Sequence, residues 1–301
     1  MVADGREVAI THPERVLFEK SHITKNDLIE YYLHIAPYMV PLVKGHPLML
    51  ERYPEGIKQE GFYQKNASSY FPSWIARVKI PKKEGGSVHH VIANNAATLV
   101  YLANQATIAF HMWTSRADKI HYPDRIVFDI DPSVDDFGLV RKTALALRTI
   151  LEHLGLTPFV MTTGSRGLHV TVPLKRTATY DQVEEFAAGV GRFMCAMYKD
   201  SITMEIRKAS RKGKIFMDVL RNSWTATAIA PYAVRPKEGA PVATPLYWYE
   251  VEGGSLTPTQ YTIENIFKRL QKKEDPWAAF YTYAKTLTTA RKRLATLLKA
   301  L

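Results

Sequence analysis

The chain has 301 residues, 46% of them hydrophobic, so it can bury one large core or two smaller ones. Its 40 basic and 29 acidic side chains leave a net charge of +11, which favours a polyanionic partner, nucleic acid first. The single Cys195 excludes an intrachain disulfide and a cysteine zinc cluster. Without a signal peptide or a stretch apolar enough to span a membrane, the sequence predicts a cytoplasmic, nucleoid-associated protein with no membrane partner.

The N-terminal part is predicted to combine two helices with several short strands. Thr24 is a typical N-cap for a helix over about 25–36. The apolar residues of that segment recur with helical spacing and lie on one face. Alternating and β-branched residues then predict strands over 47–54, 61–66, 87–95 and 107–115, with a helix over 96–106.

The rest of the chain continues the mixture. A strand over 125–131 precedes an amphipathic helix over 136–153, which Gly155 closes. Strands over 159–163 and 168–174, a helix over 180–198, a strand over 214–222 and helices over 262–273 and 286–300 follow. Neighbouring strands form hairpins, so the pattern predicts an α+β or mixed α/β fold. A weak boundary near 117–124 divides residues 1–116 from residues 117–301.

Two acids stand in the apolar strand RIVFDID. Asp129 and Asp131 are two residues apart, so their side chains point to one face, and Pro132 ends the strand just after them. Carboxylates that converge repel each other unless a cation lies between them, and oxygen ligands suit Mg²⁺ or Mn²⁺. Asp218 in KIFMDVL is a similar acid, and three carboxylates can hold two ions for phosphoryl transfer. The alternative is an Asp that caps a turn.

The turn TTGSRGLHV is the second candidate site. Gly164 and Gly167 let the backbone approach a ligand, while Thr163, Ser165 and Arg166 add donors for a triphosphate. His169 begins the next strand and can donate to a phosphate oxygen. The turn lacks the Gly-Lys-Ser/Thr of a Walker A loop, and a simple hairpin is the alternative.

Other basic and aromatic residues are ambiguous by themselves. His111 is a core histidine or a functional one, and the basic run 207–214 is a solvated loop or a nucleic-acid contact. Arg221 and Arg235 can hold phosphates or balance the carboxylates. Phe62 and Tyr63 are adjacent on a strand, so one ring is free to face solvent and stack on an unpaired base, unless both rings are core.

Taken in order, several segments resemble the polymerase domain of bacterial and archaeal ATP-dependent DNA ligase D, over roughly residues 8–275. This domain belongs to the archaeo-eukaryotic primase superfamily and works in non-homologous end joining. The segments are THPERVLFEKSHITKNDLIEYY, PLMLERYPEGI, GFYQK, HMWTSR, PDRIVFDIDPS, TTGSRGLHVTVPL, KIFMDVLRN and APYAVRPKEGAPVATPLYW. The resemblance implies a single primase-polymerase domain over 1–301, with two β-sheets flanked by helices.

The resemblance also implies roles for matching positions. The metal-binding, catalytic carboxylates are Asp129, Asp131 and Asp218, holding two Mn²⁺ or Mg²⁺ ions. The residues that hold the nucleoside or deoxynucleoside triphosphate are His111, Thr163, Ser165, Arg166, His169, Arg221 and Arg235. Arg15 and Lys25 match a pair that grips the 5′-phosphate of a DNA end or gap, and Phe62 and Tyr63 match a pair that stacks on template bases. These last four lie in residues 1–116, and the catalytic module is 117–301.

The implied activity is gap filling and end extension by a DNA-dependent DNA/RNA polymerase that prefers ribonucleotides. Family members often carry a lysine before the glycine-rich turn, whereas here Met161 and Thr162 precede Thr163, which puts one possible phosphate contact in doubt. No Lys-x-Asp-Gly ligase motif is present. We therefore expect a stand-alone polymerase or an excised polymerase domain, with a Ku-type end-binding protein and a separate ATP-dependent DNA ligase as partners.

Two other functions remain open. A primase or damage-tolerance primase-polymerase is distinguished by primer synthesis from free nucleotides, and the pair Arg15 and Lys25 favours end joining instead. A non-catalytic DNA-end-binding module would bind nucleic acid without metal-dependent activity. The three aspartates argue against that second alternative.

Overall fold

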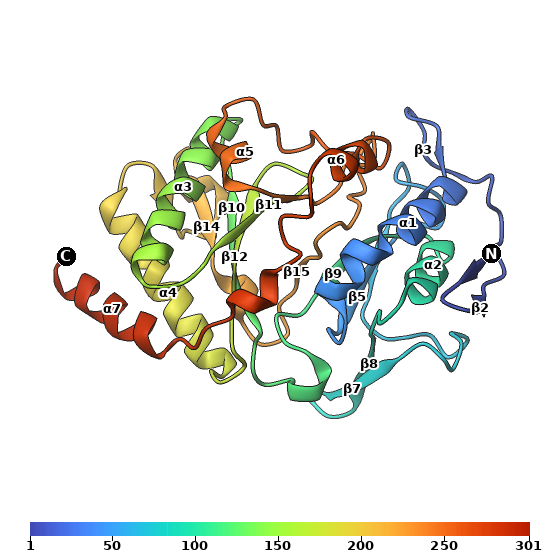
Figure 1. Ribbon diagram of the computed structural model, residues 1–301, viewed down its shortest axis with the longest axis horizontal. Helices are drawn as coiled ribbons and strands as arrows, with labels where there is room; N and C mark the ends of the chain where they lie inside the picture. The colour runs from blue at the N-terminus through green and yellow to red at the C-terminus, as the bar shows by residue number, and fades with distance from the viewer. Residues whose placement is uncertain (83) are drawn as a thin grey trace. The chain divides into compact units, whose positions relative to one another are not determined.

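The computed structural model describes residues 1–82 and 84–301, which form two compact units. Unit 1 comprises Met1–Asp118, Ile229–Thr244 and Tyr261–Glu274. Unit 2 comprises Lys119–Ala228, Pro245–Gln260 and Asp275–Leu301. The chain therefore returns to unit 1 twice after residue 118, and each unit has its own main sheet and helices (Figure 1).

Unit 1 contains a six-stranded sheet in the order β15-β9-β5-β8-β7, with β6 paired to β5. The strands are β5 (Leu48–Arg52), β6 (Phe62–Gln64), β7 (Arg77–Pro81), β8 (Ser87–Val91), β9 (Thr107–Met112) and β15 (Ala228–Ile229). Two hairpins precede it, β1 (Val2–Ala3) with β2 (Arg6–Glu7) and β3 (Val16–Phe18) with β4 (Ile23–Thr24). The helices are α1 (Lys25–Val43), α2 (Ala96–Asn104) and α6 (Ile266–Lys272).

Helix α1 begins as predicted but runs further than predicted. The Thr24 side chain accepts a hydrogen bond from the backbone of Asp27, and the Asp27 side chain accepts one from the backbone of Thr24, which forms a capping box. The predicted end near residue 36 is wrong, because the helix continues through Pro37 and Pro41. Its apolar face stays buried along that extension, and this burial outweighs the hydrogen bonds that the two prolines remove.

Unit 2 contains a second six-stranded sheet, in the order β13-β14-β10-β12-β11-β16. Its strands are β10 (Arg125–Asp131), β11 (Phe159–Thr162), β12 (Leu168–Pro173), β13 (Ile202–Thr203), β14 (Ile215–Asp218) and β16 (Pro245–Leu246). The main helices are α3 (Phe137–His153) and α4 (Tyr180–Met197), with α5 (Trp248–Glu252) and α7 (Thr288–Lys299). The predicted strand at 125–131, the hairpin after it and both long helices are confirmed.

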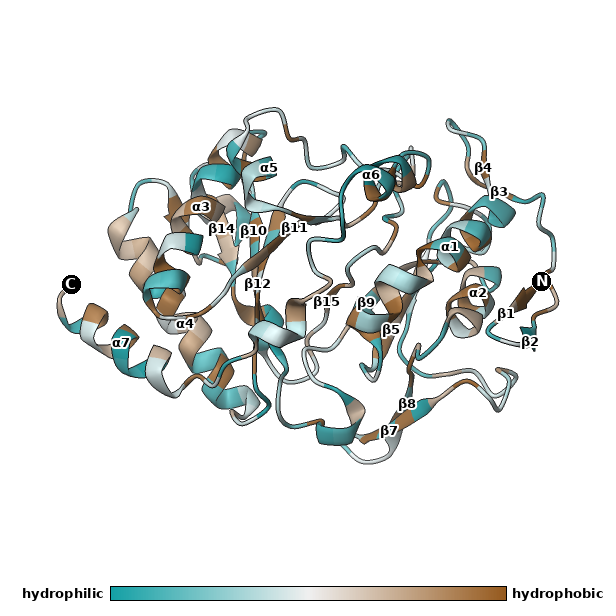
Figure 2. Cartoon of the chain, in the orientation of Figure 1, coloured by the Kyte–Doolittle hydropathy of each residue, from teal (hydrophilic) through white to brown (hydrophobic). Residues whose placement is uncertain are grey.

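Strand β10 lies inside this sheet, between β14 and β12. Its apolar residues are completely or almost completely buried, and hydrophobic residues run along β10 and β12 in Figure 2. The two main sheets flanked by helices confirm the predicted fold class. The predicted strand at 214–222 is shorter than expected. Asp218 accepts a hydrogen bond from the backbone N–H of Leu220 at 2.8 Å, and the chain turns there.

The buried Asn222 fixes that turn to the central strand. Its side chain accepts from the N–H of Val127 at 2.8 Å and donates to the carbonyls of Val127 and Val219 at 2.7 and 2.8 Å. These bonds join the segment after β14 to the interior of β10, so Asn222 connects the two strands that carry the acids.

We predict that Asn222→Ala lowers the free energy of unfolding by roughly 2–4 kcal/mol, because it leaves buried backbone groups of Val127 without partners. Urea unfolding followed by circular dichroism measures the loss. Asn26→Ala is the control, since the Asn26 amide makes only a long, exposed contact with Glu30. A loss for Asn222→Ala no larger than that of the control would contradict the assignment.

Candidate active site

The three predicted carboxylates come together in unit 2 through strand register. Asp129 on β10 lies directly opposite Asp218 on β14 and, on its other side, opposite His169 on β12. Residues opposite each other in antiparallel strands share a face, and Asp131 is two residues along from Asp129 on that face. The register therefore gathers three acids and one histidine from three strands.

Two basic side chains lie against these acids. Arg221 Nε is 3.1 Å from Asp129 Oδ2 and 3.3 Å from Asp218 Oδ2, so the guanidinium bridges the two carboxylates. His169 Nε2 is 3.4 Å from Asp129 Oδ1, within ion-pair distance but without hydrogen-bond geometry. Asp129 Oδ1 is buried and has no hydrogen-bond partner among the described residues.

The acids differ in how well their charge is balanced. Burial opposes ionisation of Asp129, but His169 and Arg221 outweigh it and lower its pKa to about 2. Burial, followed by the negative charge of Asp129, raises the pKa of Asp131 to about 6. Burial also raises the pKa of Asp218, although Arg221 acts in the opposite direction. Nearby positive charge thus offsets burial at Asp129 but only partly at Asp131 and Asp218.

A divalent cation fits this donor set. The carboxylate oxygens are the ligands that Mg²⁺ and Mn²⁺ prefer, and the unpartnered Asp129 Oδ1 has a free lone pair. As the side chains stand, the described residues contain no group of three His, Cys, Asp or Glu side chains arranged to hold a metal. The guanidinium of Arg221 bridges Asp129 and Asp218 in this arrangement.

The glycine-rich turn lies directly beside Asp131. A Cβ atom on Gly167 would stand 2.3 Å from the carbonyl oxygen of Ile130 and 2.9 Å from Asp131 Oδ1, so only glycine fits. The hydroxyl of Thr163 accepts from the Gly167 N–H at 3.2 Å and closes the turn. Arg166 is exposed, and its charge acts on Asp131.

Residues of the turn therefore divide into two kinds. Thr163 is buried and already bonded to the turn backbone, whereas the half-buried Ser165 and the exposed Arg166 are open to solvent. The triphosphate roles of Thr163, Ser165, Arg166 and His169 stay predictions.

In unit 1, the predicted 5′-phosphate pair is adjacent. The backbone N–H of Lys25 donates to the carbonyl of Arg15 at 2.7 Å. Arg15 NH1 donates to Pro54 O at 2.7 Å and to Glu55 Oε1 at 2.8 Å. The buried ammonium of Lys25 contacts Thr11 Oγ1 at 3.2 Å and a backbone carbonyl at 3.3 Å, and burial, with a smaller effect of Arg15, lowers its pKa. Glu55 pairs with Arg15, and Glu14 acts on Lys25 in the opposite direction to burial and Arg15.

His111 lies beside a buried acid that the sequence analysis did not single out. His111 Nε2 is 2.9 Å from Glu51 Oε2, and Tyr53 donates to Glu51 Oε1 at 3.1 Å. Burial opposes ionisation of Glu51, but His111 and Arg235 are among the groups that lower its pKa. The buried Nε of Arg235 has no hydrogen-bond partner among the described residues. An acid inside the apolar strand PLMLERYP is the same signal that marked Asp218, so Glu51 could have been found.

The basic run 207–214 is partly engaged locally. The guanidinium of Arg211 donates to the carbonyls of Glu205 and Ile206 at 2.9 Å and lies 3.6 Å from the centre of the Phe216 ring. This supports the alternative of a structured surface loop for that arginine.

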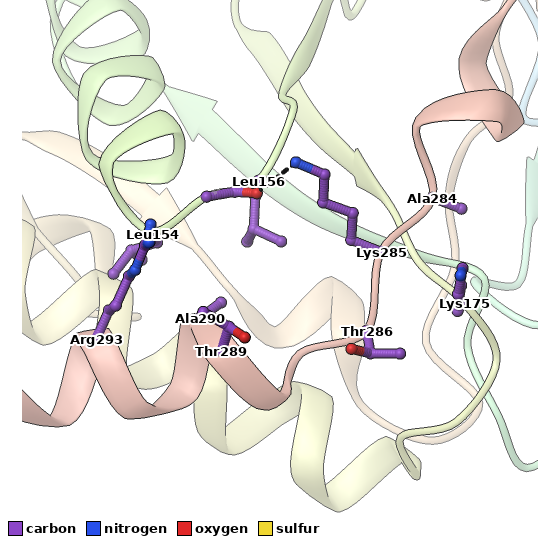
Figure 3. A pocket seen from close by; sticks show the side chains of 10 residues that line it. Leu154, Leu156, Lys175, Ala284, Lys285, Thr286, Thr289, Ala290 and Arg293 are labelled. Atoms are coloured by element: carbon purple, nitrogen blue, oxygen red, sulfur yellow. Dashed lines mark hydrogen bonds between the residues drawn. The ribbon is translucent and has the colours of Figure 1, made fainter.

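A separate cavity of about 420 Å³ in unit 2 contains none of the predicted site residues (Figure 3). Lys285 Nζ donates to the carbonyl of Gly155 at 2.8 Å, and Arg293 NH1 donates to that of His153 at 3.0 Å. Both cations therefore stabilise the C-terminal end of α3, where the helix dipole is negative. None of the helices in residues 1–82 and 84–301 has the length and hydrophobicity of a membrane span.

Residues 24–277 match the family model described as the LigD primase-polymerase domain. This chain belongs to that family. It is 32% identical over 277 residues to the bifunctional non-homologous end joining protein LigD of Bacillus subtilis, covering 91% of this chain and 44% of the relative. It is 31% identical over 291 residues to the multifunctional LigD of Pseudomonas aeruginosa, covering 95% of this chain and 34% of the relative.

The fold matches the polymerase domain from Mycobacterium tuberculosis ligase D in complex with DNA, with a TM-score of 0.87 and 27% identity. The match covers 92% of this chain and 99% of that domain. The predicted family and polymerase class are therefore confirmed, and membership implies a nucleotide substrate and divalent metal ions in general. The chain spans less than half the length of these curated LigD relatives.

In metal-free protein, we predict that Asp131→Asn is more stable than the parent at pH 8, by roughly 1–3 kcal/mol. Folding raises the pKa of Asp131 to about 6, above its value of about 3.9 in the unfolded chain. The folded protein therefore binds this proton more tightly than the unfolded chain does. The parent therefore loses stability as the pH rises from about 4 to about 6. The Asp131→Asn variant does not, because its amide has no proton to lose in this range.

Urea unfolding with a chelator at pH 4 and pH 8 tests this. The difference between variant and parent should be small at pH 4 and clear at pH 8. Asp135→Asn, at an exposed neighbouring acid, is the matched control. An Asp131→Asn variant whose advantage does not grow between the two pH values contradicts the interpretation.

Proposed function

We propose that this protein is a template-dependent nucleotidyltransferase that fills gaps and extends DNA ends during non-homologous end joining. The observation that carries the proposal is the cross-strand pairing of Asp129 with Asp218, with Asp131 on the same face. Three acids on one face beside a glycine-rich turn, two of them with raised pKa values, are suited to a metal-bound triphosphate. The solved relative in complex with DNA supports a nucleic-acid substrate.

In this mechanism Asp129, Asp131 and Asp218 would hold two Mn²⁺ or Mg²⁺ ions. When bound, such ions lower the pKa of the primer 3′-hydroxyl and neutralise the leaving pyrophosphate. The hydroxyl oxygen attacks the α-phosphorus of the nucleotide, and the bond from that phosphorus to the bridging oxygen breaks.

The chain's own groups orient that triphosphate. Arg166 and Ser165 face solvent beside Asp131, where they can bind phosphate oxygens. Arg221, once it no longer bridges Asp129 and Asp218, can do the same, and His169 keeps Asp129 ionised. We assign Thr163, on the same turn, to the nucleotide site as well. The nucleotide-binding roles of His111 and Arg235, in unit 1, stay predictions.

The DNA contacts follow from unit 1. Arg15 and Lys25 would bind the 5′-phosphate of a gap, because a phosphate anion would favour the charged form of Lys25 that burial and Arg15 disfavour. The exposed rings of Phe62 and Tyr63 would stack on template bases. We further propose that ribonucleotides are preferred, that Mn²⁺ is the favoured ion, and that a Ku-type protein and an ATP-dependent ligase complete the repair.

Primer extension on a gapped duplex tests the catalytic assignment. Asp129→Ala should reduce nucleotide addition at least about 10³-fold, because it removes the carboxylate that lies between Asp131 and Asp218 in the metal-binding cluster. Duplex binding should change little. Asp181→Ala, at an exposed acid on α4, is the control and should extend normally. Normal extension by Asp129→Ala would falsify the metal-site assignment, and synthesis without any primer by the parent would point to a primase.

The end-recognition assignment needs a different comparison. The double variant Arg15→Ala with Lys25→Ala should lose the preference for a 5′-phosphorylated gap over an unphosphorylated one. Lys58→Ala, which removes an exposed lysine paired with Glu19, should keep that preference. Circular dichroism checks that the buried position of Lys25 tolerates the change. A folded double variant that still discriminates shows that the 5′-phosphate binds elsewhere.

A further inference from the structure

The exposed aromatic residues of unit 1 gather on β6 and in the segment after it. Phe62, Tyr63 and Tyr70 are 46%, 59% and 61% exposed. An aromatic ring gains much free energy from burial, so three open rings within nine residues of sequence indicate a surface that a ligand covers. The sequence analysis had singled out only the first two.

Phe62 and Tyr63 serve opposite faces of β6, because neighbouring residues on a strand alternate. Phe62 lies opposite Arg52, whose guanidinium is 5.3 Å from the centre of the phenyl ring. Tyr63 lies opposite Glu51, and its ring centre is 5.8 Å from that of His111. One base cannot stack on both rings, so each face of β6 has its own set of neighbours.

Arg52 fixes Tyr70 on the face of β6 that carries Phe62. Its NH1 donates to Gln64 Oε1 at 2.8 Å and to the Tyr70 hydroxyl at 3.5 Å. Gln64 Nε2 donates in turn to Ser68 Oγ at 2.9 Å, which holds the segment that carries Tyr70 against the strand. The Tyr70 ring also packs edge-on against the buried Phe71, with 5.2 Å between ring centres.

We propose that Phe62, Arg52 and Tyr70 form a second stacking surface that binds unpaired bases of a single-stranded DNA end. Arg52 and Tyr70 extend this surface beyond Phe62, while Tyr63 lies on the opposite face of β6. The proposal rests on the proposed function, since it specifies which part of the DNA this unit binds. Aromatic and guanidinium planes stack on every kind of base, so the surface would bind overhangs without regard to their sequence.

The local bonding favours bases over an acidic peptide. Arg52 already donates to Gln64, to Tyr70 and, through Nε, to the carbonyl of Gln105 at 2.8 Å. Few of its N–H groups remain to bind a carboxylate in a bidentate manner, whereas the exposed rings remain open for stacking. The net charge of +11 adds a general attraction for the phosphates of the strand.

Equilibrium binding to DNA without nucleotide or metal tests the proposal. The probes are a duplex with a short single-stranded extension that carries 2-aminopurine, and a blunt duplex of the same paired length. Tyr70→Ala should weaken binding to the extended duplex about tenfold and restore 2-aminopurine fluorescence, with less than a twofold change on the blunt duplex. Tyr70→Phe should bind like the parent, because it keeps the ring.

The control is Tyr249→Ala, which removes a ring that is 54% exposed in unit 2 and should change neither probe. Three outcomes overturn the proposal: parent-like binding by Tyr70→Ala, an equal loss on both probes, or a loss in Tyr70→Phe as large as in Tyr70→Ala. The assay needs no turnover. A negative result in this binding assay therefore overturns the stacking surface alone, whereas the proposed function is tested separately by primer extension.

Discussion

The register of β10 between β14 and β12 is the constraint on which the candidate site depends. It sets Asp129 opposite Asp218 on one side and His169 on the other. Like charges held together inside a protein destabilise it unless cations compensate them. Here Arg221 and His169 compensate Asp129 well, while Asp131 and Asp218 keep raised pKa values. The fold thus retains an electrostatic cost at one point, which is typical of a site that awaits a ligand.

Residues in direct contact with β10 maintain its register. Asn222 bonds both backbone groups of Val127, so the end of β14 cannot slide along β10. Gly167 allows the glycine-rich turn to lie against the carbonyl of Ile130 without a clash. A one-residue slip would turn Asp129 to the other face of the sheet. Elements without catalytic chemistry of their own therefore determine where the acids lie.

Unit 1 shows a related arrangement with the opposite sign. Arg15 and Lys25 are held together by a backbone hydrogen bond, and burial lowers the pKa of the lysine. The exposed rings on β6 stand on a sheet that also carries the buried Glu51–His111 pair. Paired cations and open aromatic faces are the two features that bind phosphates and unpaired bases. The unit therefore has the chemistry of a nucleic-acid surface.

Much of the fold could be predicted from sequence, because local signals agreed with it. The two-residue spacing of Asp129 and Asp131 fixed their common face, and β10 has the predicted bounds. The extension of α1 past Pro37 could not be predicted, since burial of its far end decides it. The place of Arg221 between two acids, the early end of β14 and the hydrogen bonds of Asn222 depend on tertiary contacts that no local pattern encodes.

The most direct test of this account is a count of bound Mn²⁺ by electron paramagnetic resonance, with a non-hydrolysable nucleoside triphosphate present. The account predicts saturable binding of two ions by the parent protein. Asp218→Asn replaces one carboxylate oxygen opposite Asp129 with an amide nitrogen and keeps the size of the side chain. This variant should bind at least one Mn²⁺ ion fewer than the parent. If the variant binds as many ions as tightly as the parent, the paired aspartates do not form the metal site and the account is wrong.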